Sequence, residues 1–89
     1  MKIEYDEAKR QITLEQRGLD FADADQVFQG THYTLKDERK DYGESRFITI
    51  GLMNNRMVVL AWTPRALARR IISMRKANDR EQARFNKYL

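Results

Sequence analysis

The sequence predicts a small α+β domain in which helices cover one face of an antiparallel β-sheet. Before Thr31, apolar residues recur at helical spacing. After Thr31 they recur at every second residue, and helical spacing returns only near the C-terminus. The predicted strands follow one another through short loops, which favours antiparallel neighbours. The expected order is β-α-α-β-β-β-β-α, and 89 residues suffice for one domain, residues 1–89, with a single modest core.

The first part of the chain is predicted to hold a short strand and two helices. Residues 3–5 alternate in polarity, which favours an edge strand, and Asp6 is suited to cap a helix that ends at Gly18. Asp20 is the expected N-cap of a second helix, which Gly30 closes. The apolar stripe of this helix consists of Ala24, Val27 and Phe28.

Two strong strands are predicted in the middle of the chain. Residues 31–37 alternate only weakly, but residues 45–53 and 56–62 are rich in β-branched and apolar side chains. Asn54 and Asn55 separate these two segments, and asparagine tolerates the positive φ angles of a tight hairpin turn. The sequence therefore predicts a hairpin at this point.

The C-terminal part is predicted to hold one more strand and a helix. Residues 63–66 have the composition of a turn, and residues 68–76 that of a strand. Asn78 is followed three residues later by Glu81, which is the spacing of a capping box at the start of a helix. We expect this last helix to cover residues 79–88.

The charge of the chain is unevenly distributed. Residues 1–44 carry seven Lys/Arg and eleven Asp/Glu, whereas residues 45–89 carry ten and two, so the first part has a net charge of −4 and the second of +8. Most cations of the second part are arginines, which favour bidentate contact with phosphate or carboxylate. The expected partner is therefore anionic, either nucleic acid or an acidic protein.

The composition also excludes several classes of protein. The chain has no cysteine, which removes disulfides, thiolate zinc sites and thiol nucleophiles and fits a cytoplasmic protein. No apolar run approaches the roughly 18 residues of a membrane span, so no membrane partner is expected.

Two segments resemble the BrnT-type toxins of bacterial type II toxin–antitoxin pairs. They are DYGESRFITIG at Asp41–Gly51 and RIISMRKA at Arg70–Ala77, and the segment from Tyr5 to Phe28 is also similar, so that the resemblance covers nearly the whole chain. It implies a RelE/ParE-like fold and ribonuclease activity that inhibits translation. It also implies neutralisation by a ribbon-helix-helix antitoxin, through which alone the toxin would reach operator DNA.

The chain departs from the family pattern at two histidines. The usual Lys-His-Gly turn is Gln16-Arg17-Gly18 here, and the Arg-His that often precedes Asp-Tyr-Gly-Glu is Arg39-Lys40. Both differences disfavour a mechanism that depends on histidine.

Cleavage of RNA without a metal ion requires three groups at one phosphodiester. A base removes the proton of the ribose 2′-hydroxyl, cations stabilise the phosphorane, and an acid protonates the departing 5′-oxygen. No Asp/Glu set has clear metal-ligand spacing, so no metal site and no cofactor is expected. The candidate catalytic residues are Glu44, Arg46, Arg70, Ser73 and Arg75. The candidate RNA-binding residues are Arg39, Lys40, Tyr42 and Lys76, and His32, the only histidine, is a further candidate.

The last predicted strand distributes its polar side chains over two faces. In a regular strand Arg70 and Lys76 point to one side and Ser73 and Arg75 to the other, so all of them reach one cleft only if the strand bulges or breaks. We therefore prefer Arg75 together with Ser73. The alternative is that these cations lie over the sheet edge and discourage edge pairing.

Glu44 is the candidate base, although its position between Lys40 and Arg46 favours the ionised carboxylate and makes it only a moderate one. Its alternative role is an ion pair that holds Arg46 in place. Tyr42 either stacks on a base or anchors the turn before Gly43. The following large residues are expected in the core: Phe21, Val27, Phe28, Phe47, Ile50, Val59 and Trp62.

Two other functions remain open from the sequence. One is a module that binds nucleic acid or an antitoxin without catalysis. The other is a ParE-like toxin that poisons gyrase through protein contacts. The match at Arg70–Ala77 favours the ribonuclease.

Overall fold

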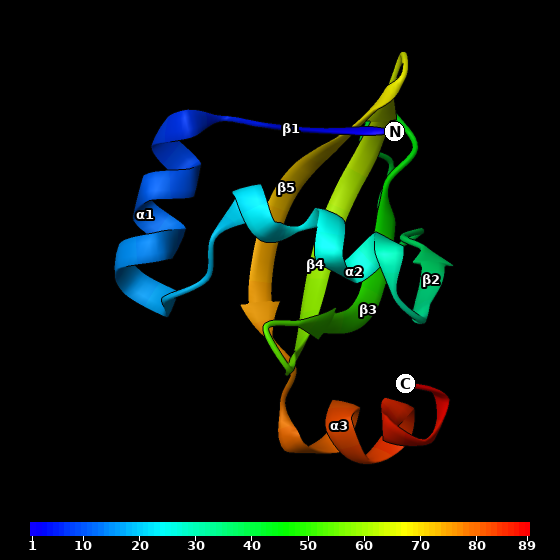
Figure 1. The fold of residues 1–89 in the computed structure, drawn as a ribbon. Helices are drawn as coiled ribbons and strands as arrows, with labels where there is room; N and C mark the ends of the chain where they lie inside the picture. Colours follow the sequence, from blue (N-terminus) through cyan, green and yellow to red (C-terminus); the bar gives the residue numbers. More distant parts are fainter.

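A five-stranded mixed sheet forms the centre of the computed structural model, which describes residues 1–89 (Figure 1). Its strands are β1 (Lys2–Tyr5), β2 (His32–Lys36), β3 (Phe47–Met53), β4 (Arg56–Arg65) and β5 (Ala68–Lys76). The α-helices are α1 (Glu7–Arg17), α2 (Asp25–Gln29) and α3 (Asp79–Phe85), with 3-10 turns at Phe21–Asp23 and Asn86–Tyr88. This succession confirms the α+β class and the predicted order of elements.

Across the sheet the strands lie in the order β1-β5-β4-β3-β2. Neighbours from β5 to β2 are antiparallel, as predicted, but β1 runs parallel to β5, so the expectation of a wholly antiparallel sheet is wrong. A strand of only four residues contains no signal for its direction. The chain carries β1 to the edge beside β5, where Ile3 and Tyr5 pack against the same core as α2.

The helices cover both faces of the sheet, and not one face as expected. On one face, α2 and the turn before it pack on a core that includes Val27, Leu60 and Met74 (Figure 1). On the other face, α3 packs through Phe85 on a smaller core around Val59. Consecutive residues of the central strand β4 are buried, and they point to opposite faces of the sheet. Both faces therefore need a covering element.

The predicted helix ends are largely confirmed. Asp6 accepts a hydrogen bond from the Lys9 amide, and Gly18 has the left-handed φ of +67° that ends α1. Asp20 does act as a cap, but of a 3-10 turn, so the second α-helix is shorter than expected and begins only at Asp25. No helix of the structure has the length and apolar character to cross a membrane.

The hairpin at Asn54-Asn55 is confirmed, since their φ angles are +51° and +63°. The turn expected at residues 63–66 is wrong, because β4 continues through Pro64 to Arg65. Pro64 is tolerated because β3 pairs with β4 only as far as Trp62, so the missing amide removes no bond to β3. The chain reverses instead at Ala66, whose φ is +50°.

The C-terminal helix has the capping box that its sequence predicts. Asn78 accepts from the Glu81 amide, and the Glu81 carboxylate accepts from the Asn78 amide. The helix ends earlier than expected, at Phe85, and a 3-10 turn completes the segment. Of the residues expected in the core, Phe28 and Phe47 are only half-buried, and the following are buried: Phe21, Val27, Ile50, Val59 and Trp62.

Candidate functional site

The face of the sheet that carries α3 is only partly covered. Phe85 and its neighbours bury Ile50 and Val59, but Ile48 and Ala61, which lie farther along the same face, stay partly accessible. The loop between β2 and β3 borders this open area, where Thr63 donates a hydrogen bond to the Ser45 carbonyl. The open part of this face is therefore framed by a charged loop and by the strand β5.

A bulge in β5 determines which side chains reach this face. Trp62 pairs with Ile71 and Ala61 pairs with Ser73, so Ile72 has no partner of its own on β4. As a result Ile71 and Met74 both enter the core under α2. The side chains of Arg70, Ser73 and Arg75 alternate with these two and therefore share the open face.

The same bulge separates Lys76 from the other cations. Lys76 follows Met74 by two residues, pairs with Val58 and lines a hollow beside the Asn54-Asn55 hairpin. It does not lie on the open face. The sequence analysis concluded that these cations could share one cleft only if β5 bulged, and the bulge is present. It places Arg70 and Arg75 on the same face of the sheet and Lys76 on the opposite face.

Arg75 is bound by a carboxylate of α3. Its two terminal nitrogens lie 2.7 and 2.9 Å from the two carboxylate oxygens of Glu81. This pairing raises the pKa of Arg75 and lowers the pKa of the Glu81 carboxyl. The Arg75 side chain is still 47% exposed, and Arg39 lies close enough to oppose its charge. The sequence indicated Glu81 only as a helix cap, because the ion pair depends on how α3 docks.

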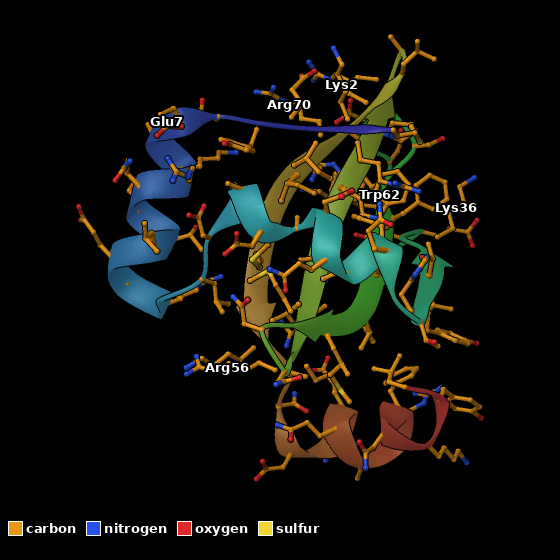
Figure 2. The ribbon with its side chains drawn as sticks, in the orientation of Figure 1. Lys2, Glu7, Lys36, Arg56, Trp62 and Arg70 are labelled. Carbon is orange, nitrogen blue, oxygen red and sulfur yellow. The ribbon has the colours of Figure 1, made fainter.

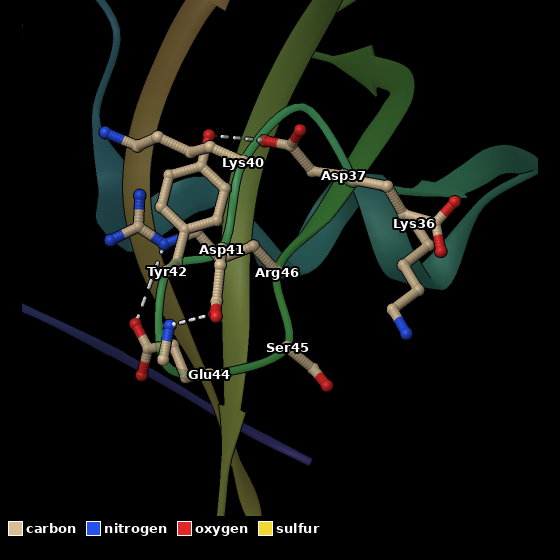
Figure 3. Close-up of a pocket in the computed structure, with 10 residues that line it drawn as sticks. Lys36, Asp37, Lys40, Asp41, Tyr42, Glu44, Ser45 and Arg46 are labelled. Carbon is tan, nitrogen blue, oxygen red and sulfur yellow. Dashed lines mark hydrogen bonds and ion pairs between the residues drawn. The ribbon is translucent and has the colours of Figure 1, made fainter.

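The loop of residues 37–46 is held by a buried carboxylate that the sequence analysis missed (Figure 3). Asp37 accepts from the Arg39 amide and from two guanidinium nitrogens of Arg39, both at 2.8 Å. It also accepts from the Tyr42 hydroxyl at 3.2 Å. These bonds hold the pKa of the Asp37 carboxyl well below its usual range, and the bonds from the Arg39 side chain contribute most. Arg39 and Tyr42 therefore first serve to order the loop.

Tyr42 supports the cations of the loop. The Arg46 guanidinium lies 4.0 Å from the centre of the Tyr42 ring, and the Lys40 ammonium lies 5.1 Å from it (Figure 3). Because the hydroxyl is bonded to Asp37, the ring is fixed, and it fixes the plane of the guanidinium. Tyr42 thus anchors the turn and also orients Arg46.

Arg46 and Glu44 face each other without a hydrogen bond. The Arg46 Nε atom lies 3.6 Å from one Glu44 oxygen, and an Arg65 terminal nitrogen lies 3.9 Å from the other. The buried Arg46 Nε has no hydrogen-bond partner. The Nε atom itself is out of reach, but the Arg46 and Glu44 side chains are 28% and 34% exposed, so the Arg46 terminal nitrogens and the Glu44 oxygens keep bonding capacity for a phosphodiester.

Two candidates are less available. Arg70 donates to Glu4 at 2.7 Å, which ties it to β1, the strand beside which Figure 2 shows it. The His32 ring bonds the Gly30 carbonyl at 2.8 Å and packs on Phe28, beside α2. His32 therefore lies away from the face that holds Arg46.

Two hollows border the open face. One of about 520 Å³ lies within the loop around Lys40, Tyr42 and Glu44. The other, about 250 Å³, lies between the sheet and α3, and three arginines line it: Arg75, Arg80 and Arg84. The sequence analysis missed Arg80 and Arg84, although their spacing of four residues places both on one side of a helix. Nowhere do three or more His, Asp or Glu side chains gather in a way that could hold a metal ion.

A small basic α+β domain with arginines, a carboxylate and a fixed tyrosine around an open sheet face has the features of a protein that handles phosphodiesters. A family model described as "Ribonuclease toxin, BrnT, of type II toxin-antitoxin system" matches residues 5–81. The chain therefore belongs to the BrnT family of ribonuclease toxins, and membership in a type II system implies an antitoxin partner. A search of curated proteins gave no significant match.

Proposed function

We propose that this chain is an endoribonuclease that cleaves RNA without a metal ion and thereby inhibits translation. The observation that carries the proposal is the bulge in β5, which places Arg70, Ser73 and Arg75 on the open face that the loop of Arg46 and Glu44 borders. Membership in a family of ribonuclease toxins supports it. We also infer a RelE-like fold and action in the cytoplasm.

The proposed chemistry uses Glu44 and Arg46, which form no hydrogen bond to each other, and Arg75, which must exchange its bonds to Glu81 for bonds to phosphate. The Glu44 carboxylate takes the proton of a ribose 2′-hydroxyl, and the freed oxygen attacks the adjacent phosphorus. Arg46, held against Tyr42, and Arg75 stabilise the charge of the phosphorane. The bond to the 5′-oxygen breaks, and that oxygen takes a proton from water while Ser73 donates a hydrogen bond to it. The products are a 2′,3′-cyclic phosphate and a free 5′-hydroxyl.

Expression of the chain tests this proposal against the gyrase poison and the non-catalytic module. We expect growth arrest with a fall in translation before any sign of DNA damage. The Glu44→Gln variant keeps the shape of the side chain but removes the base, and we expect it to lose arrest. DNA damage with translation still running would refute the ribonuclease, and undiminished arrest by Glu44→Gln would remove Glu44 from the mechanism.

We further infer that the antitoxin is a ribbon-helix-helix protein that neutralises the toxin by covering the open face. Stable interfaces of this kind bury about 1,200–2,000 Å² or more. We expect Arg46 and Arg75 to be protected from an arginine-modifying reagent in the complex and modified in the free toxin. Equal modification in both states would show that neutralisation does not occur by occlusion.

A further inference from the structure

An aromatic cluster at the C-terminal end of the chain is not used in the proposed chemistry. We define it as Tyr33 of β2, Phe85 of α3 and Tyr88 of the final 3-10 turn. The centre of the Tyr33 ring lies 5.4 Å from that of Phe85 and 6.0 Å from that of Tyr88. Figure 1 shows how the C-terminal turn returns to β2 and so joins segments that are far apart in sequence.

The three rings differ in accessibility. Phe85 is 6% exposed and belongs to the core under α3, whereas Tyr33 is 41% and Tyr88 53% exposed. The hydroxyls of Tyr33 and Tyr88 form no hydrogen bond within the protein, unlike that of Tyr42, which is bonded to Asp37. Two partly exposed tyrosine rings thus rest on a buried phenylalanine, and exposed aromatic rings of this kind are the surfaces on which unpaired bases stack.

Cations surround the cluster and connect it to the proposed catalytic face. The Arg84 guanidinium lies 5.3 Å from the Phe85 ring centre, and the Lys87 ammonium lies 5.2 Å from that of Tyr88. The 250 Å³ hollow is lined by Arg84, Arg80 and Arg75 and so leads from the cluster to the catalytic face. Glu81 is the only acidic residue that lines it, and Arg75 already neutralises its charge.

We propose that the aromatic cluster is a base-stacking subsite for single-stranded RNA. One unpaired base stacks on Tyr33 and Tyr88, while Arg84 and Lys87 hold its phosphate and Arg80 guides the strand toward Arg75. A duplex does not fit this arrangement, because its bases are already stacked on each other. This inference rests on the proposed function, because it describes the path of the RNA substrate across the same open face.

The test measures binding and not cleavage. A labelled single-stranded RNA with every 2′-hydroxyl methylated cannot be cut, and a sugar-phosphate oligomer of equal length carries the same charge without bases. Tyr33→Leu and Tyr88→Leu keep apolar bulk against Phe85 but remove the aromatic face. Ile12→Ala and Lys9→Ala are the matched controls, because both side chains are exposed on α1.

We expect each tyrosine variant to bind the methylated RNA about 5- to 150-fold more weakly, since stacking of one base contributes about 1–3 kcal/mol. Binding of the base-free oligomer should not change. Arg84→Ala should weaken binding of both oligomers and lower the salt dependence by about one phosphate contact. The α1 controls should bind both oligomers like the wild type.

Three binding results would overturn the subsite. They are unchanged RNA binding in folded tyrosine variants, an equal loss for both oligomers, and a loss of antitoxin binding alone. A lower melting temperature without a base-dependent effect would assign the cluster to stability only, and would also overturn it. Cleavage of unmodified RNA is measured separately. Base-dependent binding by a wild-type chain that cuts no RNA would refute the ribonuclease and leave the subsite in place.

Discussion

Replacement of Arg75 separates a catalytic role from a structural one, because this residue is bound to Glu81 in the free chain. Three variants make the distinction. Arg75→Ala removes the cation, and Arg75→Lys keeps the charge but loses the planar fork that holds two oxygens. Glu81→Gln removes the carboxylate charge but keeps a side chain that supports the capping box of α3.

The structure sets the expected loss of stability. The Arg75 side chain is 47% and the Glu81 side chain 21% exposed, so solvent screens the pair, and exposed pairs contribute about 0.2–1 kcal/mol. For a domain of this size 1 kcal/mol corresponds to a shift of roughly 4–8 °C in the melting temperature. Arg75→Ala should therefore stay folded at 25 °C. Glu81→Gln should lose about the same stability, since it breaks the same pair.

The expected loss of activity is larger. Removal of one donor that stabilises transition-state charge typically lowers the rate about 10²- to 10³-fold, which is roughly 2.7–4 kcal/mol. We expect Arg75→Ala to lose nearly all cleavage and toxicity and Arg75→Lys to lose most. Glu81→Gln should cleave RNA at least as well as the wild type, because no carboxylate then competes with phosphate for Arg75. Cleavage of a labelled RNA and thermal melts of the same preparations measure both quantities.

The reasoning is refuted if Glu81→Gln and Arg75→Ala lose cleavage to the same extent. Arg75 would then act only by holding α3 in place. Full activity in Arg75→Lys together with a large drop in the melting temperature of Arg75→Ala would lead to the same conclusion. Full toxicity of a folded Arg75→Ala protein would remove Arg75 from the site.

Three further predictions follow from particular contacts. Arg46→Lys should fold normally but cleave poorly, since lysine keeps the charge and loses the planar contact with Tyr42; wild-type cleavage rates would contradict this. Asp37 has a lowered pKa in the folded state, so its stabilisation is present above the unfolded pKa of about 3.9 and is lost as the pH falls through the folded value. Melts should thus show Asp37→Asn less stable than the wild type at pH 7, with a smaller difference at pH 3. A Cβ on residue 51 would lie 2.7 Å from a methyl of Val27, so Gly51→Ala should cost about 1–3 kcal/mol in denaturant unfolding, and Val27→Ala should cost less in that background than alone.

Features of the fold that depend on neighbouring residues were predictable from the sequence. The cap at Asp6, the left-handed Gly18, the Asn54-Asn55 hairpin and the capping box at Asn78 each result from a few adjacent side chains. The direction of β1, the covering of both sheet faces and the path of β4 through Pro64 depend on partners that are distant in sequence. These features were predicted wrongly for that reason.

The candidate site shows the same division. Glu44 and Arg46 are two residues apart, so their proximity could be predicted. The sequence analysis named a bulge in this strand as a requirement for a shared cleft but could not predict that it exists. Its presence at Ile72 depends on the register between β4 and β5. The partners of Arg75 and Arg70 lie six and 66 residues away in sequence, and no local pattern indicated them.

These long-range pairs change the meaning of the charge asymmetry. The sequence suggested an acidic part and a strongly basic part, but Glu4 and Glu44 of the acidic part face Arg70 and Arg46 of the basic part. The fold therefore cancels much of the basic charge where β5 and the loop meet. Arg80 and Arg84 of α3 form no ion pair, but Asp79 and Glu81 of the same helix balance their charge. An RNA that reaches the open face therefore meets arginines that carboxylates already hold in place, and its phosphates must compete with those carboxylates for the guanidinium groups.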